Sequence, residues 1–193
     1  MRVLYYTDEK VDLASFRIYV HNAFPVLPWW HWMVMAVVAL GVTLILTQRK
    51  EWSTYATVTL AITVFVGLFL LDGTVFGRLD SEELQFSPLD IQAEYRRLLE
   101  CPIGMRILMV FNVAAFIPFG VALSEFLCST QSIRAKRCLG SVVVTSFGLS
   151  LLIECLQLLL KVGLFEIMDI VLNSSGAVLG TTIALFIRKK ICR

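Results

Sequence analysis

The chain has 193 residues, of which 58% are hydrophobic and only 17% are charged. Because a soluble domain carries about a quarter charged residues, this composition excludes an ordinary soluble globule. The formal net charge of +2 is too small for the basic surface that nucleic-acid binding requires, so we expect no nucleic-acid partner.

The N-terminal segment, residues 1–28, has apolar residues at helical spacing: Leu13, Phe16, Val20 and Phe24. This pattern predicts an amphipathic segment that lies on the membrane surface. Three tryptophans that suit the lipid head-group zone follow it: Trp29, Trp30 and Trp32.

Five stretches with little or no charge account for the hydrophobicity: 29–47, 54–71, 107–124, 139–160 and 170–187. A helix needs about 20 apolar residues to cross the hydrocarbon core of a bilayer. Because lipid cannot pair backbone polar groups, each stretch is predicted to be helical. We therefore expect an all-α fold, a polytopic transmembrane helical bundle of about five spans with one or two surface amphipathic helices.

These elements divide the chain into five predicted parts. An N-terminal amphipathic segment (1–28) precedes a two-helix membrane hairpin (29–71). An extracellular loop (72–106) follows, with an amphipathic helix that begins at Ser87-Pro88, a cap hydroxyl followed by a first-turn proline. A three-helix core (107–187) and a basic tail (188–193) complete the chain.

The basic residues predict the orientation of the bundle. More than half of the 17 lysines and arginines fall in three short segments, 48–53, 125–138 and 188–193. By the positive-inside rule these segments face the cytoplasm. The C-terminus is then cytoplasmic, and the N-terminus and the loop 72–106 are extracellular.

Polar residues interrupt the last three spans, and two pairs of them share a helical face. Glu154 and Gln157 are three residues apart in the fourth span, and Asp169 and Asn173 are four apart in the fifth. With a rise of 1.5 Å per residue, Glu154, Asn173 and Asn112 of the third span lie about 6 to 10 Å below the outer membrane edge. The sequence therefore predicts one polar level that three helices share.

A buried carboxyl group is the most informative member of this set. An ionisable side chain in hydrocarbon costs about 3 kcal/mol or more, so Glu154 should face the bundle interior or a wet cavity. Lys161, one turn beyond Gln157, is a candidate ion-pair partner for it. Each amide taken singly is more typical of a contact that only joins helices than of a binding site. We expect the following five residues to form a polar, ligand-binding pocket that faces outward: Asn112, Glu154, Gln157, Asp169 and Asn173.

Two further features of these spans are structural. Pro118 is predicted to kink the third span and to free a carbonyl near Ala114. Gly176 and Gly180 form the small-residue motif of closely packed membrane helices. With two histidines and no Walker or dinucleotide motif, the chain is expected to bind neither metal nor cofactor.

Three blocks of residues, in this order, resemble the VanZ-like family of bacterial membrane proteins: Asn112-x-x-x-Phe116-x-Pro118-x-Gly120, Glu154-x-x-Gln157 and Asp169-x-x-x-Asn173-x-x-Gly176-x-x-x-Gly180. The resemblance covers residues 84–187. It implies a bacterial plasma-membrane protein that contributes to tolerance of teicoplanin-like lipoglycopeptides or of other envelope stress. It implies no enzymatic activity.

Three classes of function remain open from the sequence. The first is a membrane protein that contacts lipids and binds a lipid-linked envelope precursor or a lipoglycopeptide. The second is an intramembrane enzyme in which Glu154 or Asp169 is a general acid or base, although no nucleophile or metal set accompanies them. The third is a small proton-coupled transporter with a titrating Glu154, although no inverted repeat is visible.

Overall fold

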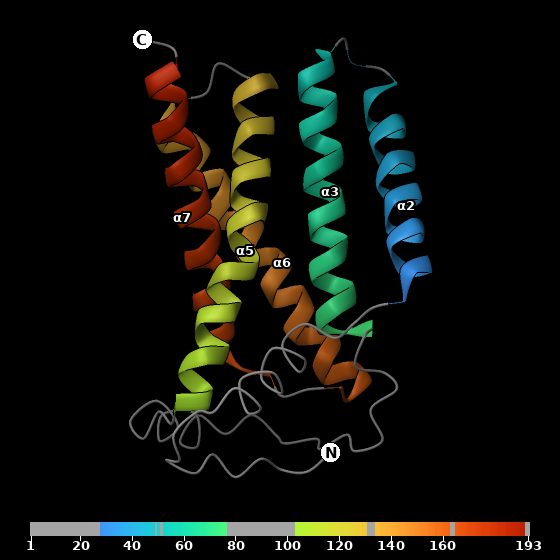
Figure 1. Cartoon of the computed structure of the whole chain (residues 1–193), viewed down its shortest axis with the longest axis vertical. Coiled ribbons are helices and arrows are strands. Elements are labelled where there is room, and N and C mark those ends of the chain that lie inside the picture. Colours follow the sequence, from blue (N-terminus) through green and yellow to red (C-terminus); the bar gives the residue numbers. More distant parts are fainter. Residues whose placement is uncertain are drawn as a thin grey trace.

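The computed structural model describes residues 28–48, 50, 52–76, 103–130, 134–162 and 165–191. Five long helices make up these parts of the chain (Figure 1): α2 (Trp29–Thr47), α3 (Thr54–Thr74), α5 (Ile103–Thr130), α6 (Ala135–Leu160) and α7 (Ile167–Ile191). Each is long and apolar enough to cross a membrane. The predicted all-α bundle of five spans is confirmed. Residues 1–27 of the predicted N-terminal amphipathic segment, and the amphipathic helix predicted to begin at Ser87-Pro88, lie outside the described residues.

Four of the helices are longer than the spans predicted from hydropathy. The third span, predicted at 107–124, is the helix Ile103–Thr130, and the fifth, predicted at 170–187, is Ile167–Ile191. Hydropathy marks the part of a helix inside the hydrocarbon core, whereas the helix continues through the polar interface on each side. For the same reason α3 runs on to Thr74, so Asp72 belongs to a helix and not to a loop.

Local sequence explains where α3 begins and where α6 ends. The Ser53 hydroxyl accepts a hydrogen bond from the Ala56 N–H at 3.2 Å, which caps α3. At the end of α6, Lys161 adopts the left-handed conformation with φ of 58°. The Val162 N–H then reaches back to the Gln157 carbonyl at 3.0 Å, the arrangement of a Schellman turn.

The ends of the helices define two ends of the bundle. One end carries the described cations Lys50, Arg134, Lys136, Arg137, Arg188, Lys189 and Lys190, and we call it the basic end. The opposite end, where α2, α5 and α7 begin and α3 and α6 finish, we call the Trp29 end (Figure 1). There His31 of α2 bonds Asp72 of α3 at 2.7 Å, which closes the α2–α3 hairpin.

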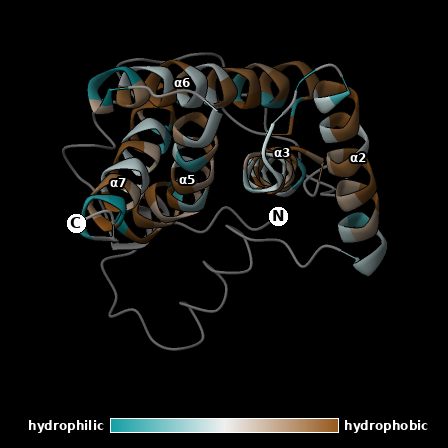
Figure 2. Ribbon diagram, turned by 90° about the horizontal axis from the view of Figure 1, so that it is seen from above, coloured by the Kyte–Doolittle hydropathy of each residue, from teal (hydrophilic) through white to brown (hydrophobic). Residues whose placement is uncertain are grey.

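Helix α6 lies obliquely across the others, as the view along the bundle shows (Figure 2). It begins beside α5, where the Cys138 thiol is 3.9 Å from the Ser124 carbonyl oxygen. It ends beside α3, where the Gln157 amide bonds the Thr74 carbonyl. One helix therefore contacts different neighbours at different depths. The core around it comprises Leu70, Val75, Phe116, Phe119, Leu123, Val142, Ile153, Val162 and Ala177.

Helices α5 and α7 pack closely because glycines line their contact. A Cβ atom on Gly176 would lie 2.1 Å from the Val113 carbonyl oxygen, and one on Gly180 would lie 2.1 Å from that of Ile117. A Cβ atom on Gly120 would likewise collide with the carbonyl oxygen of Ala177. The predicted small-residue contact is thus a backbone-to-backbone approach between these two helices.

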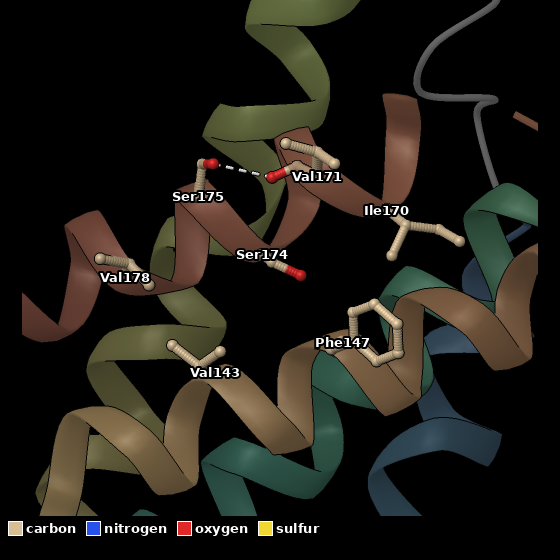
Figure 3. A pocket seen from close by; sticks show the side chains of 7 residues that line it. All are labelled: Val143, Phe147, Ile170, Val171, Ser174, Ser175 and Val178. Carbon is tan, nitrogen blue, oxygen red and sulfur yellow. Dashed lines mark hydrogen bonds between the residues drawn. The ribbon is translucent and has the colours of Figure 1, made fainter. Parts of the chain in front are cut away.

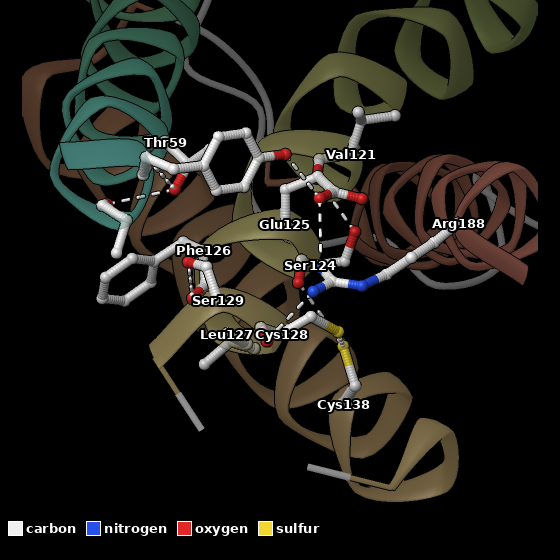
Figure 4. A network of polar contacts seen from close by, with 12 residues as sticks. Thr59, Val121, Ser124, Glu125, Phe126, Leu127, Cys128, Ser129, Cys138 and Arg188 are labelled. Atoms are coloured by element: carbon white, nitrogen blue, oxygen red, sulfur yellow. Dashed lines mark hydrogen bonds and ion pairs between the residues drawn. The ribbon is translucent and has the colours of Figure 1, made fainter. Parts of the chain in front are cut away.

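A polar network joins three helices at the basic end (Figure 4). The Glu125 carboxylate of α5 accepts hydrogen bonds from the Tyr55 hydroxyl of α3 at 2.7 Å and from the Arg188 guanidinium of α7 at 3.3 Å. Arg188 also donates to the Cys128 carbonyl at 3.4 Å. The free thiols of Cys128 and Cys138 lie 3.7 Å apart beside it.

Candidate functional site

Glu154 is buried in α6, with 2% of its surface exposed. Its carboxylate accepts a hydrogen bond at 2.9 Å from the backbone N–H of Glu166, the residue directly before α7. The N-terminus of a helix carries partial positive charge and unpaired N–H groups, so it stabilises an anion placed there.

Gln157 lies one turn nearer the Trp29 end and is also buried. Its side-chain amide donates to the Thr74 carbonyl at the end of α3, at 3.0 Å. That carbonyl belongs to the last turn of α3, where no later helical N–H can pair with it. Gln157 therefore ties α6 to α3.

Asn173 of α7 is buried and donates to the Ser150 hydroxyl of α6 at 2.9 Å. Ser150 is fully buried and was not among the predicted residues. A sequence signal for it exists, because Ser146 and Ser150 precede Glu154 and Gln157 at helical spacing on one face of α6. This polar stripe is the sequence feature that indicates a buried role for Ser150.

The two remaining predicted residues, Asp169 and Asn112, differ from these three because neither is fully buried. Asp169 is half-buried in the first turn of α7, where its N–H bonds the Glu166 carbonyl at 3.1 Å. Asn112 of α5 is half-buried one turn before the buried Phe116 and on the same face. No hydrogen bond among the described residues joins Asn112 to the other four.

We call the buried polar groups along α6 and α7 the polar seam: Ser150, Glu154, Gln157 and Asn173. From the Trp29 end inward, its contacts run from Gln157 to Glu154 and then to the Ser150–Asn173 pair. At 1.5 Å per residue, the seam covers about 10 Å of α6. Each of its four side chains bonds another part of the protein, so the seam fixes the positions of α3, α6 and α7.

One expectation about the neighbours of the seam needs correction. Lys161 is exposed at the C-cap of α6 and makes no ion pair with Glu154. Its left-handed backbone conformation belongs to the turn after α6. The hydrogen bond expected from the lysine to Glu154 is donated by the backbone N–H before α7. Pro118 lies within α5, and both it and Ala114 are exposed, on a different face from Asn112.

A groove of about 350 Å³ opens between α6 and α7 beside the polar seam (Figure 3). Val143 and Phe147 of α6 form one wall, and the other wall comprises Ile170, Val171, Ser174, Ser175 and Val178 of α7. The lining is largely apolar and contains none of the five predicted residues. Within the described part of the chain, no three His, Cys, Asp or Glu side chains are placed to hold a metal ion.

Five apolar helices with buried polar groups between them define a multi-pass membrane protein. The sequence profile of the VanZ/LLP1 family matches residues 32–188, and the chain belongs to this family. The match is broader than the resemblance over 84–187, because it includes most of α2 and all of α3. Comparison with curated proteins and with solved structures found no match.

Proposed function

We propose that this protein binds an amphipathic molecule of the bacterial cell envelope between α6 and α7 and so contributes to tolerance of teicoplanin-like glycopeptides. The observation that carries the proposal is the position of the groove beside a line of buried polar groups on the same two helices. In this proposal the apolar tail of the molecule lies in the groove, and its polar head lies beside the helix segments that carry the buried polar groups. Family membership supports a membrane role.

The proposal places the protein in the plasma membrane with its basic end in the cytoplasm. The lysines and arginines of the basic end support this orientation through the positive-inside rule. The Trp29 end, with Glu154 and Gln157 near it, then faces the outer leaflet. Lipid-linked envelope precursors and glycopeptides are present on that side of the membrane.

The test is drug tolerance of cells that carry variants of the polar seam. We expect Glu154→Gln and Asn173→Ala to reduce the tolerated teicoplanin concentration by about tenfold, the factor that corresponds to about 1.4 kcal/mol of binding free energy. Protein abundance in the membrane is measured in parallel by immunoblotting. Thr182→Ala is the matched control, because Thr182 is exposed on α7 and its hydroxyl bonds only its own helix, at the Val178 carbonyl.

If tolerance and abundance fall together in the Glu154 and Asn173 variants, the polar seam stabilises the fold and the proposal fails. The proposal also fails if wild-type protein gives no tolerance above that of cells without it. Loss of tolerance at full abundance, with Thr182→Ala unchanged, supports it.

A further inference from the structure

The groove between α6 and α7 runs along α7 at the depth of the lipid chains. Its lining on α7 runs from Ile170 to Val178, about 4 to 17 Å from the start of the helix at 1.5 Å per residue. The hydrocarbon core is about 30 Å thick, so the groove extends from near the Trp29 end to the middle of the bilayer. This is the depth range of the chains of one leaflet.

The surroundings of the groove are apolar and open to the membrane. Phe147 and Val171, on opposite walls, are 50% and 53% exposed, so their outer surfaces contact hydrocarbon when the five helices span a bilayer. At this depth the groove is surrounded by hydrocarbon and not by water. The molecules that reach the groove are therefore the acyl chains of lipids.

The Ser174 hydroxyl in the groove differs from the other hydroxyls of α7 in its hydrogen bonding. The hydroxyls of Ser175, Thr181 and Thr182 each donate to the carbonyl four residues earlier, at 2.7, 2.9 and 2.8 Å. The Ser174 hydroxyl oxygen is buried and has no hydrogen-bond partner among the described residues. It points into the space between α6 and α7 (Figure 3). A hydroxyl without a partner in an apolar medium is costly, so a bound molecule that offers an acceptor is favoured there.

We propose that the groove binds an ester-linked acyl chain of a membrane lipid, whose ester carbonyl accepts a hydrogen bond from Ser174. Ser174 follows Asn173 in the chain, so a lipid held in this way has its head beside the polar seam. The inference rests on the proposed function for the head group, and on the groove and Ser174 for the chain. The inference adds two features to the proposed ligand, an acyl chain and an ester linkage, which the polar seam alone does not specify.

The experiment uses the full chain in nanodiscs with two matched photoactivatable phospholipids, one ester-linked and one ether-linked, each with the reactive group on the chain. Crosslinks are mapped to peptides of α6 and α7 by mass spectrometry. We expect the ester-linked probe to label the groove peptides about two- to tenfold more than the ether-linked probe, the factor of one hydrogen bond. Ser174→Ala should remove that difference.

Filling the groove provides a second, independent variant. Val171→Trp places a large ring in the groove at an exposed position and should abolish labelling by both probes. Ile183→Trp is the matched control, because Ile183 is 41% exposed on the same helix and lies outside the groove. Labelling of Val171→Trp at the wild-type level would overturn the inference. Equal labelling of wild type by the ester and ether probes would overturn it as well.

The outcomes separate this inference from the proposed function. If groove labelling behaves as expected but Glu154→Gln keeps full drug tolerance, the proposed function fails and the lipid groove stands. If tolerance depends on the polar seam but the groove is not labelled, only the inference fails. Preferential labelling by a polyisoprenyl phosphate probe, which has no ester carbonyl, would also reject it.

Discussion

Glu154 illustrates how a carboxylate is accommodated in a membrane bundle. One of its contacts is a hydrogen bond of 2.9 Å from a backbone N–H at the start of α7, where the helix offers both unpaired donors and partial positive charge. The same contact makes Glu154 important for the position of α7, which is why membrane abundance accompanies every tolerance measurement on its variants.

Lys161 has a backbone conformation that favours glycine. Its φ of 58° places it in the left-handed region at the C-cap of α6, and its side chain is exposed. Lys161→Gly should therefore raise the free energy of unfolding by about 0.5 to 1 kcal/mol, because glycine has no Cβ to oppose this conformation. The measurement is unfolding of the purified protein in detergent. Lys161→Ala serves as the control, and a gain of equal size in that variant would contradict the explanation.

At the scale of elements, the closest contact is the one between α5 and α7. Gly176→Ala directs a Cβ at the Val113 carbonyl oxygen, and backbone cannot move aside as a flexible side chain can. We expect this variant to lower the free energy of unfolding by about 2 to 3 kcal/mol, at the upper end for overpacking. Unfolding in detergent and yield of folded protein report the effect.

Gly148 of α6 provides the matched control for that substitution. A Cβ atom there would meet nothing within 4 Å, and the residue is also inside a helix. Gly148→Ala should leave stability unchanged or raise it by up to about 1 kcal/mol through helix propensity. Equal destabilisation of both variants would show that the α5–α7 contact has no special role.

The whole molecule has an asymmetry of charge that predicts its orientation. Pro28 and Gln48 are exposed at opposite ends of α2, and Lys161 is exposed at the Trp29 end of α6. In a chain whose native cysteines are replaced by serine, Pro28→Cys and Lys161→Cys should react with a membrane-impermeant maleimide in intact cells. Gln48→Cys should react only after the membrane is opened. The reverse pattern would place the polar seam on the cytoplasmic side.

The sequence alone determined the number and identity of the membrane-spanning helices in the described part of the chain. Crossing a bilayer requires a local run of apolar residues, and hydrocarbon forces such a run into a helix, so no knowledge of neighbours is needed. It also singled out Glu154, Gln157 and Asn173, because polar side chains in such runs are rare and must be accommodated. Gly176 and Gly180 of α7 were identifiable from their spacing, which is the small-residue motif of closely packed membrane helices.

Only the tertiary structure decided which of these groups meet. The oblique path of α6 brings Gln157 to α3 and Ser150 to Asn173, whereas Asn112, at a similar expected depth, bonds none of them. His31 and Asp72 are 41 positions apart and meet because α2 and α3 form a hairpin. Depth follows from counting residues along one helix. Pairing depends on the tilt and rotation of several helices, which long-range packing sets.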